Sequence, residues 1–328
     1  MNASKHNGTK LTGGWRSIVI AAAAVIVSAC GGDRPQGKLN PEPAASLTSV
    51  ERPHRRHTSI RVGILSFRNA SFAYQRYRPL LDYLADEIGQ DFALVPLSPT
   101  SQFEEVAAHE LDLVITNPLA AVQLHRLYDA EFVITQKRLR TGTQFGGQIV
   151  VKRSSPIETL EDLRGQRVAC VNFQTAAGGC VFQIHHLLQR GIDPHTDFAS
   201  FIELSSQNNI VLGLLNGSLD AGFVRTGQLK QMAANGLIED TSTLRVLEPQ
   251  QDSFPHPHTT SLYPEWAVLA LRRTSPRLTS LVKDRLLALP PEHSALAAAQ
   301  LEGFVPVADY SQINLLIEQL RLKGWDVK

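Results

Sequence analysis

A stretch of small and polar residues, Val171-Asn-Phe-Gln-Thr-Ala-Ala-Gly-Gly-Cys180, has the composition of an anion-binding loop. The surrounding pattern predicts a strand over 167–171 and a helix from about 180 to 189. Small residues between a strand and a helix let backbone N–H groups approach an anion, and the helix dipole favours negative charge at that end. We therefore predict an oxyanion site that includes Thr175, Gly178 and Gly179. A tight strand-to-helix turn without a ligand is the alternative.

Cys180 is predicted in the first turn of that helix, a position that favours the thiolate. A thiol there can contact a sulfur anion, act as a soft ligand or act as a nucleophile. The sequence pairs no base with it, so we do not expect a catalytic thiol. A packed small residue and a disulfide with Cys170 are the other readings, and spacing alone does not decide between them.

Arg225 follows a predicted strand over 221–224. An arginine at the carboxyl end of a strand can donate two parallel hydrogen bonds to an oxyanion. A surface salt bridge is the alternative. We take Arg225 and the adjacent Thr226 as candidate ligand-binding residues.

His256 and His258 lie in a polar run that continues through 261. Two histidines at this spacing can suggest a metal site. No third ligand is near them in the sequence, so we expect no metal, and no motif calls for a cofactor. His258 remains a candidate for the rim of the anion site.

Two series of strands and helices alternate along the chain, one from about residue 61 and one from about residue 148. Such alternation predicts an α/β protein with parallel sheets covered by helices on both faces. We expect two lobes, each a mostly parallel sheet flanked by helices. The first lobe holds 58–145 and 260–328, the latter with the C-terminal helices, and the second holds 146–259.

The loops at the carboxyl ends of the predicted strands are the places where α/β proteins bind ligands. We expect the loops over 66–70, 116–118, 172–179 and 225–227 to face one cleft between the lobes. The candidate ligand-binding residues there are Ser66, Tyr74, Thr116, Asn117, Thr175, Gly178, Gly179, Cys180, Arg225 and Thr226, with Tyr263 or His258 at the rim.

The N-terminal residues predict export and lipidation. A positive segment precedes an apolar run over 18–27 that is too short to span a bilayer, and Val27-Ser-Ala-Cys30 looks like a bacterial lipobox. We expect 1–29 to be a lipoprotein signal peptide and Cys30 to carry the lipid anchor on the inner or outer membrane, facing the periplasm. A plain secretory signal is the alternative. The proline-rich segment over 30–57 reads as a disordered tether.

The charge balance argues against a nucleic-acid partner. The chain has 32 Lys and Arg against 31 Asp and Glu. Cleavage before Cys30 removes three basic residues and no acidic ones, which leaves 29 against 31 and a net charge near −2. No basic stripe marks a nucleic-acid surface.

Over roughly residues 59–289 the chain resembles the PhnD-like family of periplasmic phosphonate-binding proteins. The stretches that carry the resemblance are Arg61-Val-Gly-Ile-Leu, Tyr77-Arg-Pro-Leu-Leu-Asp-Tyr-Leu, Leu113-Val-Ile-Thr-Asn-Pro-Leu, Leu160-Glu-Asp-Leu-Arg-Gly-Gln-Arg-Val-Ala, Gly191-Ile-Asp-Pro and Gly217-Ser-Leu-Asp-Ala-Gly. The Gly178-Gly179 pair, Val224-Arg-Thr226 and Leu262-Tyr-Pro-Glu-Trp266 are similar to the branch found in tetrathionate-type sensor kinases.

The resemblance implies the type II periplasmic binding protein fold, in which two lobes close on a ligand. It also implies a loop rich in Ser and Thr at the start of the second-lobe helix. Here the matching stretch is Thr175-Ala-Ala-Gly178, which lacks most of those hydroxyls.

We therefore expect a solute-binding protein, not an enzyme, that delivers a phosphonate-, phosphite- or phosphate-like oxyanion to an ABC transporter permease. The alternative is a ligand-sensing accessory protein for a membrane histidine kinase, with a sulfur oxyanion or an arsenite-type ligand.

Overall fold

The computed structural model describes residues 59–325, except 68 and 109. These residues belong to one compact unit. The predicted signal peptide, Cys30 and the tether lie outside the described residues. Within the described part, no helix is both long enough and apolar enough to cross a membrane.

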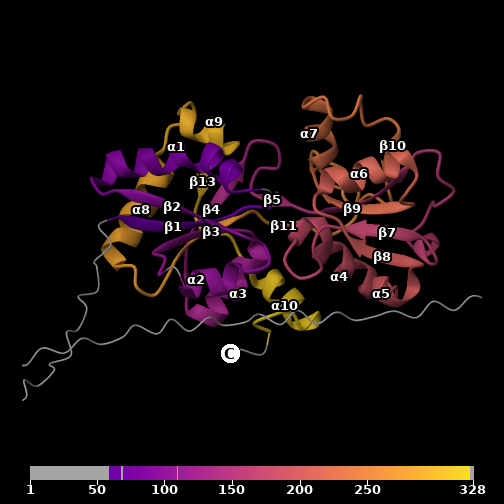
Figure 1. Ribbon diagram of the computed structural model, residues 1–328, viewed down its shortest axis with the longest axis horizontal. Coiled ribbons are helices and arrows are strands. Elements are labelled where there is room, and N and C mark those ends of the chain that lie inside the picture. The colour runs from indigo at the N-terminus through magenta and orange to yellow at the C-terminus, as the bar shows by residue number, and fades with distance from the viewer. Residues whose placement is uncertain (1–58, 68, 109, 326–328) are drawn as a thin grey trace, which may run out of the picture. The chain divides into compact units, whose positions relative to one another are not determined.

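The first lobe is built on a six-stranded sheet with the strand order β13-β4-β12-β3-β1-β2. Its strands are β1 (Ile60–Leu65), β2 (Phe92–Leu97), β3 (Leu113–Thr116), β4 (Glu131–Arg138), β12 (Ala267–Ala270) and β13 (Leu301–Val305). The helices of this lobe are α1 (Ala70–Ile88), α2 (Gln102–Ala108), α3 (Pro118–Tyr128), α8 (Pro276–Ala288), α9 (Ser294–Ala299) and α10 (Ser311–Gln319). Figure 1 shows α1 and α9 on one face of this sheet and α2 and α3 on the other.

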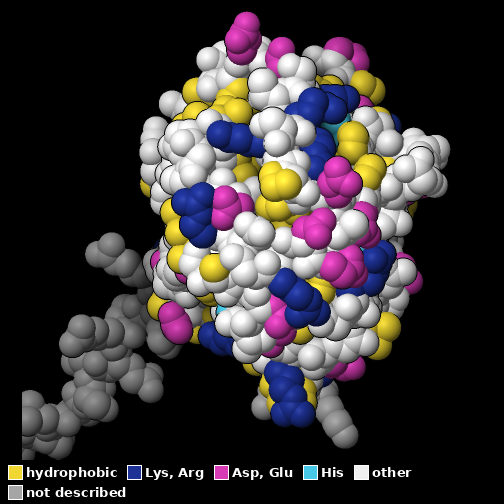
Figure 2. Space-filling view, turned by 90° about the vertical axis from the view of Figure 1, so that its right-hand side faces the viewer, with side chains coloured by type: hydrophobic (Ala, Val, Ile, Leu, Met, Phe, Trp, Pro, Cys, Tyr) yellow, Lys and Arg dark blue, Asp and Glu magenta, His cyan; other side chains and the backbone are white. Residues whose placement is uncertain are grey.

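The second lobe is built on a five-stranded sheet with the strand order β10-β6-β9-β7-β8. Its strands are β6 (Gly147–Lys152), β7 (Arg167–Cys170), β8 (Ser200–Glu203), β9 (Ala221–Arg225) and β10 (Leu244–Val246). Its helices are α4 (Phe182–Gln189), α5 (Pro194–Asp197), α6 (Gln207–Asn216) and α7 (Gln228–Ala234), with a 3₁₀ turn at Glu161–Leu163 and a π-helical turn at Ala177–Val181 before α4. Figure 2 looks onto this lobe, whose surface carries basic and acidic side chains interspersed with small hydrophobic patches.

The two-lobed α/β fold is confirmed, but the sheets are mixed rather than mostly parallel. In the first lobe the parallel pairs are β1 with β2 and β1 with β3. Strand β12 is antiparallel to β3 and β4, and β13 is antiparallel to β4. In the second lobe β6 is antiparallel to β9 and β10, whereas β7 pairs in parallel with β8 and β9. Strands β6 and β12 come directly after the chain passes from one lobe to the other, where no βαβ unit fixes the direction, whereas β13 lies at the edge of the first sheet after α8 and α9.

Helix α1 shows how the local sequence encodes an element of this fold. The Asn69 side chain caps the helix by accepting a hydrogen bond from the Phe72 N–H at 2.9 Å, and Gly89 ends it in the left-handed region at φ 71°. The buried residues Ala73, Tyr77, Leu80, Leu81 and Leu84 recur at helical spacing and pack on the sheet. Burial of each large apolar side chain contributes about 1.5–3 kcal/mol. The helix therefore packs firmly on the sheet. It begins at Ala70, a short loop after β1 ends at Leu65.

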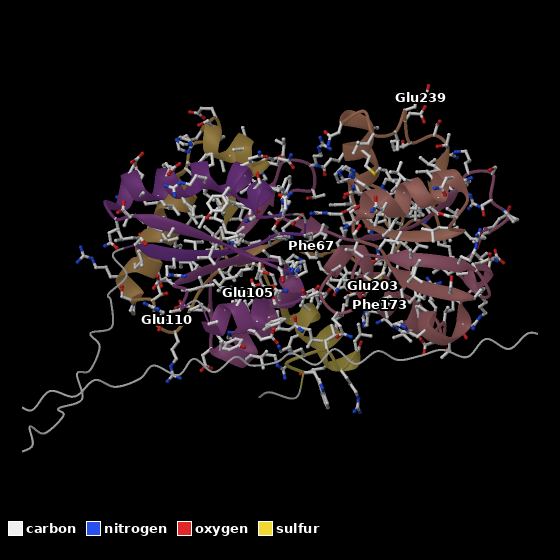
Figure 3. All side chains as sticks on the ribbon, viewed as in Figure 1. Phe67, Glu105, Glu110, Phe173, Glu203 and Glu239 are labelled. Carbon is white, nitrogen blue, oxygen red and sulfur yellow. A yellow bond between two sulfur atoms is a disulfide. The ribbon has the colours of Figure 1, made fainter. Side chains whose placement is uncertain are left out.

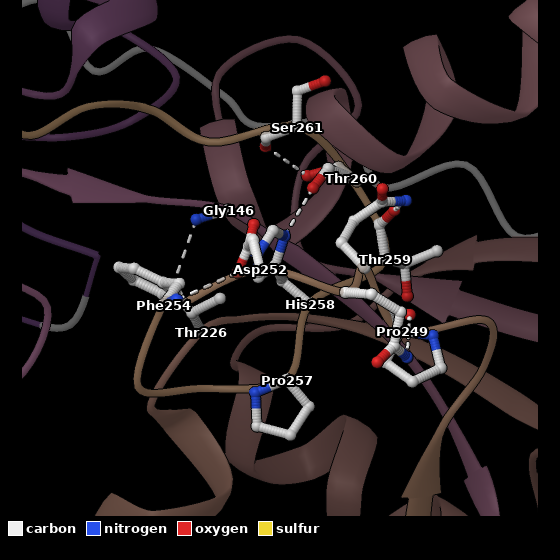
Figure 4. Close-up of polar contacts among 12 residues, drawn as sticks. Gly146, Thr226, Pro249, Asp252, Phe254, Pro257, His258, Thr259, Thr260 and Ser261 are labelled. Carbon is white, nitrogen blue, oxygen red and sulfur yellow. Dashed lines mark hydrogen bonds and ion pairs between the residues drawn. The ribbon is translucent and has the colours of Figure 1, made fainter.

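The two chain crossings between the lobes lie side by side. Strand β5 (Gln144–Phe145) pairs in antiparallel fashion with β11 (Tyr263–Pro264). Next to this pair, the Gly147 N–H donates to the Thr260 hydroxyl at 2.9 Å and the Ile149 N–H donates to the Thr259 hydroxyl at 3.0 Å. Figure 4 shows Thr259 and Thr260 on the returning segment, with the Thr260 hydroxyl donating to the Ser261 carbonyl. The two threonine hydroxyls accept the N–H groups at the start of β6, where β10 does not pair with it. The segment with Thr259 and Thr260, which leads back to the first lobe, is thereby held against the second lobe.

The lobes also contact each other on the side of α4 and α10. The Phe182 ring packs against Tyr263 in a tilted arrangement with centroids 4.0 Å apart, and the Asn117 amide donates to the Thr175 carbonyl at 3.0 Å. His185 of α4 lies 2.5 Å from the Gln319 side chain of α10. A continuous hydrophobic cluster runs through this contact, because it includes Ala177 and Phe182 as well as first-lobe residues.

Candidate functional site

A cavity of about 170 Å³, called here the main compartment, lies between the two lobes. First-lobe residues from the end of β1, the start of α1 and the end of β4 line one wall, and second-lobe residues from β9, α6 and α7 line the other. Phe67, labelled in Figure 3, lies between the lobes and packs against the hydrophobic core of the second lobe. The full lining is Leu65, Ser66, Phe67, Phe72, Ala73, Arg76, Tyr77, Arg138, Val171, Ser206, Gln207, Asn208, Arg225, Gln228, Gln231 and Trp266.

A second cavity of about 130 Å³, called here the side compartment, adjoins the main one. Both compartments are lined by Arg76, Arg138, Arg225 and Gln231. The side compartment adds Leu139, Arg140, Thr141, Thr226, Gly227 and Gln300. Three arginines therefore stand at the junction of the two cavities.

A single carboxylate, Glu265, organises two of these arginines. Glu265 is fully buried, and its side chain accepts from Arg138 Nε at 3.0 Å and from Arg225 Nη2 at 2.8 Å. The Thr141 hydroxyl donates to the same carboxylate at 2.6 Å. Arg138 comes from β4 of the first lobe and Arg225 from β9 of the second. Glu265 therefore forms an ion pair with a guanidinium group from each lobe.

Arg76, on α1, adds a further positive charge. Its Nε donates to the Ala299 carbonyl at 2.9 Å, and within the described part of the chain no carboxylate forms an ion pair with it. Burial lowers the pKa of Arg76 to about 10, and the charges of Arg138 and Arg225 act in the same direction. At neutral pH all three arginines are charged, and with Glu265 ionised the cluster carries a net charge of +2.

The positive charge of the arginines lowers the pKa values of two neighbouring acidic groups, Glu265 and Tyr77. Burial alone raises the pKa of Glu265, but Arg225 and Arg138 outweigh it and lower that pKa below its usual value. Burial likewise raises the pKa of Tyr77, and the charges of Arg76 and Arg138 bring it below its usual value. Because unneutralised charge is costly in a buried site, the cluster is suited to bind an anion.

Aromatic rings hold the guanidinium groups in place. Arg138 Cζ lies 5.0 Å from the centroid of Trp266, and Arg225 Cζ lies 4.7 Å from that of Phe145. These distances are in the range of cation–π contacts. Together with the Glu265 ion pairs, they fix two arginines in the orientation that lines the cavities.

Three of the residues predicted from the sequence line the cavities. Ser66 and Arg225 line the main compartment, and Arg225 and Thr226 line the side compartment. The Thr226 hydroxyl also accepts from the Gly146 N–H at 3.2 Å.

The predicted glycine loop supports the cavity wall instead of lining it. A Cβ on Gly179 would lie 2.7 Å from Nε2 of Gln207, a lining residue, and one on Gly178 would lie 2.8 Å from the Phe145 ring. The Thr175 hydroxyl donates to the Asn172 side chain at 2.7 Å. The small residues therefore make room for neighbouring side chains, and their N–H groups do not form the cavity lining.

Cys180 is bonded to Cys170, and both residues are fully buried. The bridge joins the end of β7 to the π-helical turn and closes the loop over 171–179. Figure 3 labels Phe173 of this loop and Glu203 of β8, where the Phe173 N–H donates to the Glu203 carboxylate at 2.5 Å. Of the readings left open by the sequence, the disulfide is the one found.

The remaining predicted residues also lie outside both linings. Thr116 is buried and donates to Gln102 at 3.2 Å, and the amide of Asn117 is used in the contact between lobes. Tyr74 is 43% exposed and its hydroxyl donates to the Leu94 carbonyl at 3.0 Å. His258, also predicted, is buried between the Thr260 carbonyl and the Asp252 carboxylate. The predicted Tyr263 is buried and packs against Phe182.

Sequence reasoning missed most of the cluster: Arg76, Tyr77, Arg138, Gln207, Glu265 and Trp266. A signal was present for three of them, because Tyr77 opens one of the stretches that carry the family resemblance and Glu265 and Trp266 lie in another, Leu262–Trp266. Arg138 had no local signal, because the apolar run of its strand, Phe132-Val-Ile134, stops well before it, and the residue becomes notable only beside Glu265.

The two lobes, the cavity between them and the cationic cluster define a two-lobed solute-binding protein. A family model described as "ABC transporter, phosphonate, periplasmic substrate-binding protein" matches residues 62–311. The chain belongs to this family.

Known relatives agree on the fold. The chain is 28% identical over 265 residues to the tetrathionate sensor histidine kinase TtrS of Salmonella typhimurium. This match covers 79% of this chain, which therefore spans less than half of the kinase, 43% of its length. XAC2383 from Xanthomonas citri, solved with ATP, has a TM-score of 0.66 at 18% identity, covering 80% of this chain and 98% of that one. PhnD1 from Prochlorococcus marinus, solved with methylphosphonate, has a TM-score of 0.63 at 16% identity, again covering 80% and 98%.

Proposed function

We propose that this protein captures a small oxyanion between its lobes and presents it to an ABC transporter permease, while a lipid on Cys30 holds it at the periplasmic face of a membrane. The observation that carries the proposal is the cluster of Arg76, Arg138 and Arg225 around the single carboxylate of Glu265. Its net charge of +2 matches a phosphonate, phosphite or phosphate dianion.

The cluster also gives a physical reason for ligand-dependent closure. Arg76 and Arg138 belong to the first lobe and Arg225 to the second, so bringing the lobes together brings like charges together. Glu265 offsets part of that repulsion. A bound dianion would offset the rest, and its differential affinity for the closed arrangement would shift the population toward closure.

The test is Arg225→Ala with calorimetric titration, after a thermal-shift screen over phosphate, phosphite, methylphosphonate and thiosulfate has chosen the anion. A charge-assisted hydrogen bond contributes about 1.5–3 kcal/mol. At about 1.4 kcal/mol per decade, the affinity should fall by about tenfold to more than a hundredfold. The matched control is Arg272→Ala, because the Arg272 side chain is 86% exposed and lies outside both linings. Wild-type affinity in the folded Arg225→Ala protein would remove the arginine cluster from ligand binding.

A second function is a ligand-sensing accessory protein for a membrane histidine kinase. The observation that favours it is the 28% identity to a sensor kinase, against 16–18% to the solved structures above. The same cluster would then hold a sulfur oxyanion or an arsenite-type ligand.

Membrane reconstitution separates the two clients. Ligand-loaded protein should raise the ATPase activity of the permease in the first case and change kinase autophosphorylation in the second. In either assay the Arg225→Ala protein serves as the control for ligand dependence.

A further inference from the structure

The size of the main compartment indicates a ligand larger than an inorganic tetrahedral ion. Its volume is about 170 Å³. A water-sized group needs about 10–15 Å³, so a cavity of this volume accommodates roughly 11 to 17 of them. A phosphate or phosphite fills less than half, which leaves room for a substituent on the oxyanion.

The walls of the two compartments differ from each other. Rings and aliphatic side chains, including Phe67, Phe72, Val171 and Trp266, form much of the main compartment. The side compartment carries Arg140, Thr141 and Thr226 in addition to the shared arginines. The apolar surface available to a substituent is thus on the main-compartment side of the cluster.

Neither wall offers a partner for a positively charged substituent. Among the described residues, no Asp or Glu lines either compartment, and Glu265 is fully buried behind Arg138 and Arg225. Aromatic faces can attract cations, but guanidinium groups already face two of these rings. Arg138 Cζ lies 5.0 Å from the Trp266 centroid, and Arg76 Cζ lies 5.9 Å from the Phe72 centroid. An ammonium group bound here would lose its hydration and meet like charge.

From these walls we infer that the site selects an organic oxyanion whose substituent carries no positive charge, with the oxyanion against Arg76, Arg138 and Arg225 and the substituent along the aromatic wall of the main compartment. This inference rests on the proposed oxyanion-binding function. It adds the rejection of zwitterionic ligands, which the charge of the cluster alone does not require.

The test uses isosteric pairs of ligands in calorimetric titrations. Propylphosphonate and 2-aminoethylphosphonate have the same number of non-hydrogen atoms and differ in a methyl against an ammonium group. Propane-1-sulfonate and 2-aminoethanesulfonate form the corresponding sulfonate pair. The member without the ammonium group should bind at least about tenfold more tightly in the pair whose head group binds, and propylphosphonate should bind more tightly than phosphate.

A substitution at Gln231 should improve binding of the amino-substituted ligands. Gln231 lines both compartments from α7 and is only half-buried, so a charged side chain fits there. Gln231→Glu places a carboxylate in the shared wall, and Gln231→Met is the uncharged control. Relative to Gln231→Met, the Glu variant should shift the affinity ratio by about tenfold toward the amino-substituted ligand.

Equal affinity for both members of a pair, or an unchanged ratio in Gln231→Glu, would overturn the inference. If both members also weaken in Arg225→Ala, the proposed function stands while the inference fails. Absence of binding to all four ligands and to phosphate would instead count against the proposed function itself.

Discussion

Replacement of Glu265 by Gln should destabilise the ligand-free protein strongly. The substitution keeps the shape of the side chain but removes the charge that pairs with Arg138 at 3.0 Å and Arg225 at 2.8 Å. Breaking a buried ion pair by neutralising one partner costs about 3–5 kcal/mol, because the remaining charges stay buried. For a protein of this size each kcal/mol shifts Tm by about 2–4 °C, so Tm should fall by roughly 10 °C.

The assay is thermal or urea unfolding of wild type, Glu265→Gln and Glu302→Gln. The control Glu302 forms an exposed pair with Lys137, with side chains 37% and 46% accessible, and an exposed pair contributes about 0–1 kcal/mol. Glu265→Gln should also regain stability when a saturating anion is added, since the uncompensated arginines bind it.

The stability that Glu265 contributes should depend on pH. Because the pKa of Glu265 is lowered in the folded protein, its contribution to stability is present above the pKa of the unfolded chain. That contribution is lost as the pH falls through the folded-state value. The gap between wild type and Glu265→Gln should therefore be widest at neutral pH and narrow in acid. A Glu265→Gln protein as stable at pH 7 as Glu302→Gln would refute the account of the cluster.

Three further predictions concern positions around and outside the site. Changing Cys170 and Cys180 together to Ser should lower the free energy of unfolding by about 3 kcal/mol for a loop of this length, and reductant should lower Tm in wild type but not in the double variant. Gly178→Ala should cost about 1–3 kcal/mol in urea unfolding, because the new Cβ would lie 2.8 Å from the Phe145 ring; no measurable loss would mean that the loop relaxes. Cys30→Ser should release the protein from the membrane fraction, and unchanged fractionation on immunoblots would exclude the lipid anchor.

Much of the fold was readable from the sequence because its elements are locally encoded. The apolar positions of α1 recur at helical spacing between Asn69 and Gly89, and a buried strand such as Leu113–Thr116 stops at a helix-capping Asn117. By contrast, β12 and β13 were missed. Both are short antiparallel strands whose partner β4 lies far away in the sequence, so nothing local indicated their pairing.

The site was readable only in part, for the same reason. Arg225 was predicted because it ends a recognisable strand, a position where donors collect. The Gly178-Gly179 pair suggested anion contact, whereas these glycines lie outside both cavity linings and pack closely against Phe145 and Gln207. Small residues suit either arrangement, and the sequence does not show which neighbours surround them.

The sequence by itself determined the α/β class, the division into two lobes and one arginine of the candidate site, because periodicity, caps and strand ends are properties of short segments. Only the tertiary structure decided that Arg76, Arg138 and Arg225 meet around Glu265 and that Cys170 is bonded to Cys180. The arginines come from α1, β4 and β9 and the carboxylate from the segment after β11. Their charge can act as one cluster only after both sheets have formed and the two chain crossings have brought the lobes together.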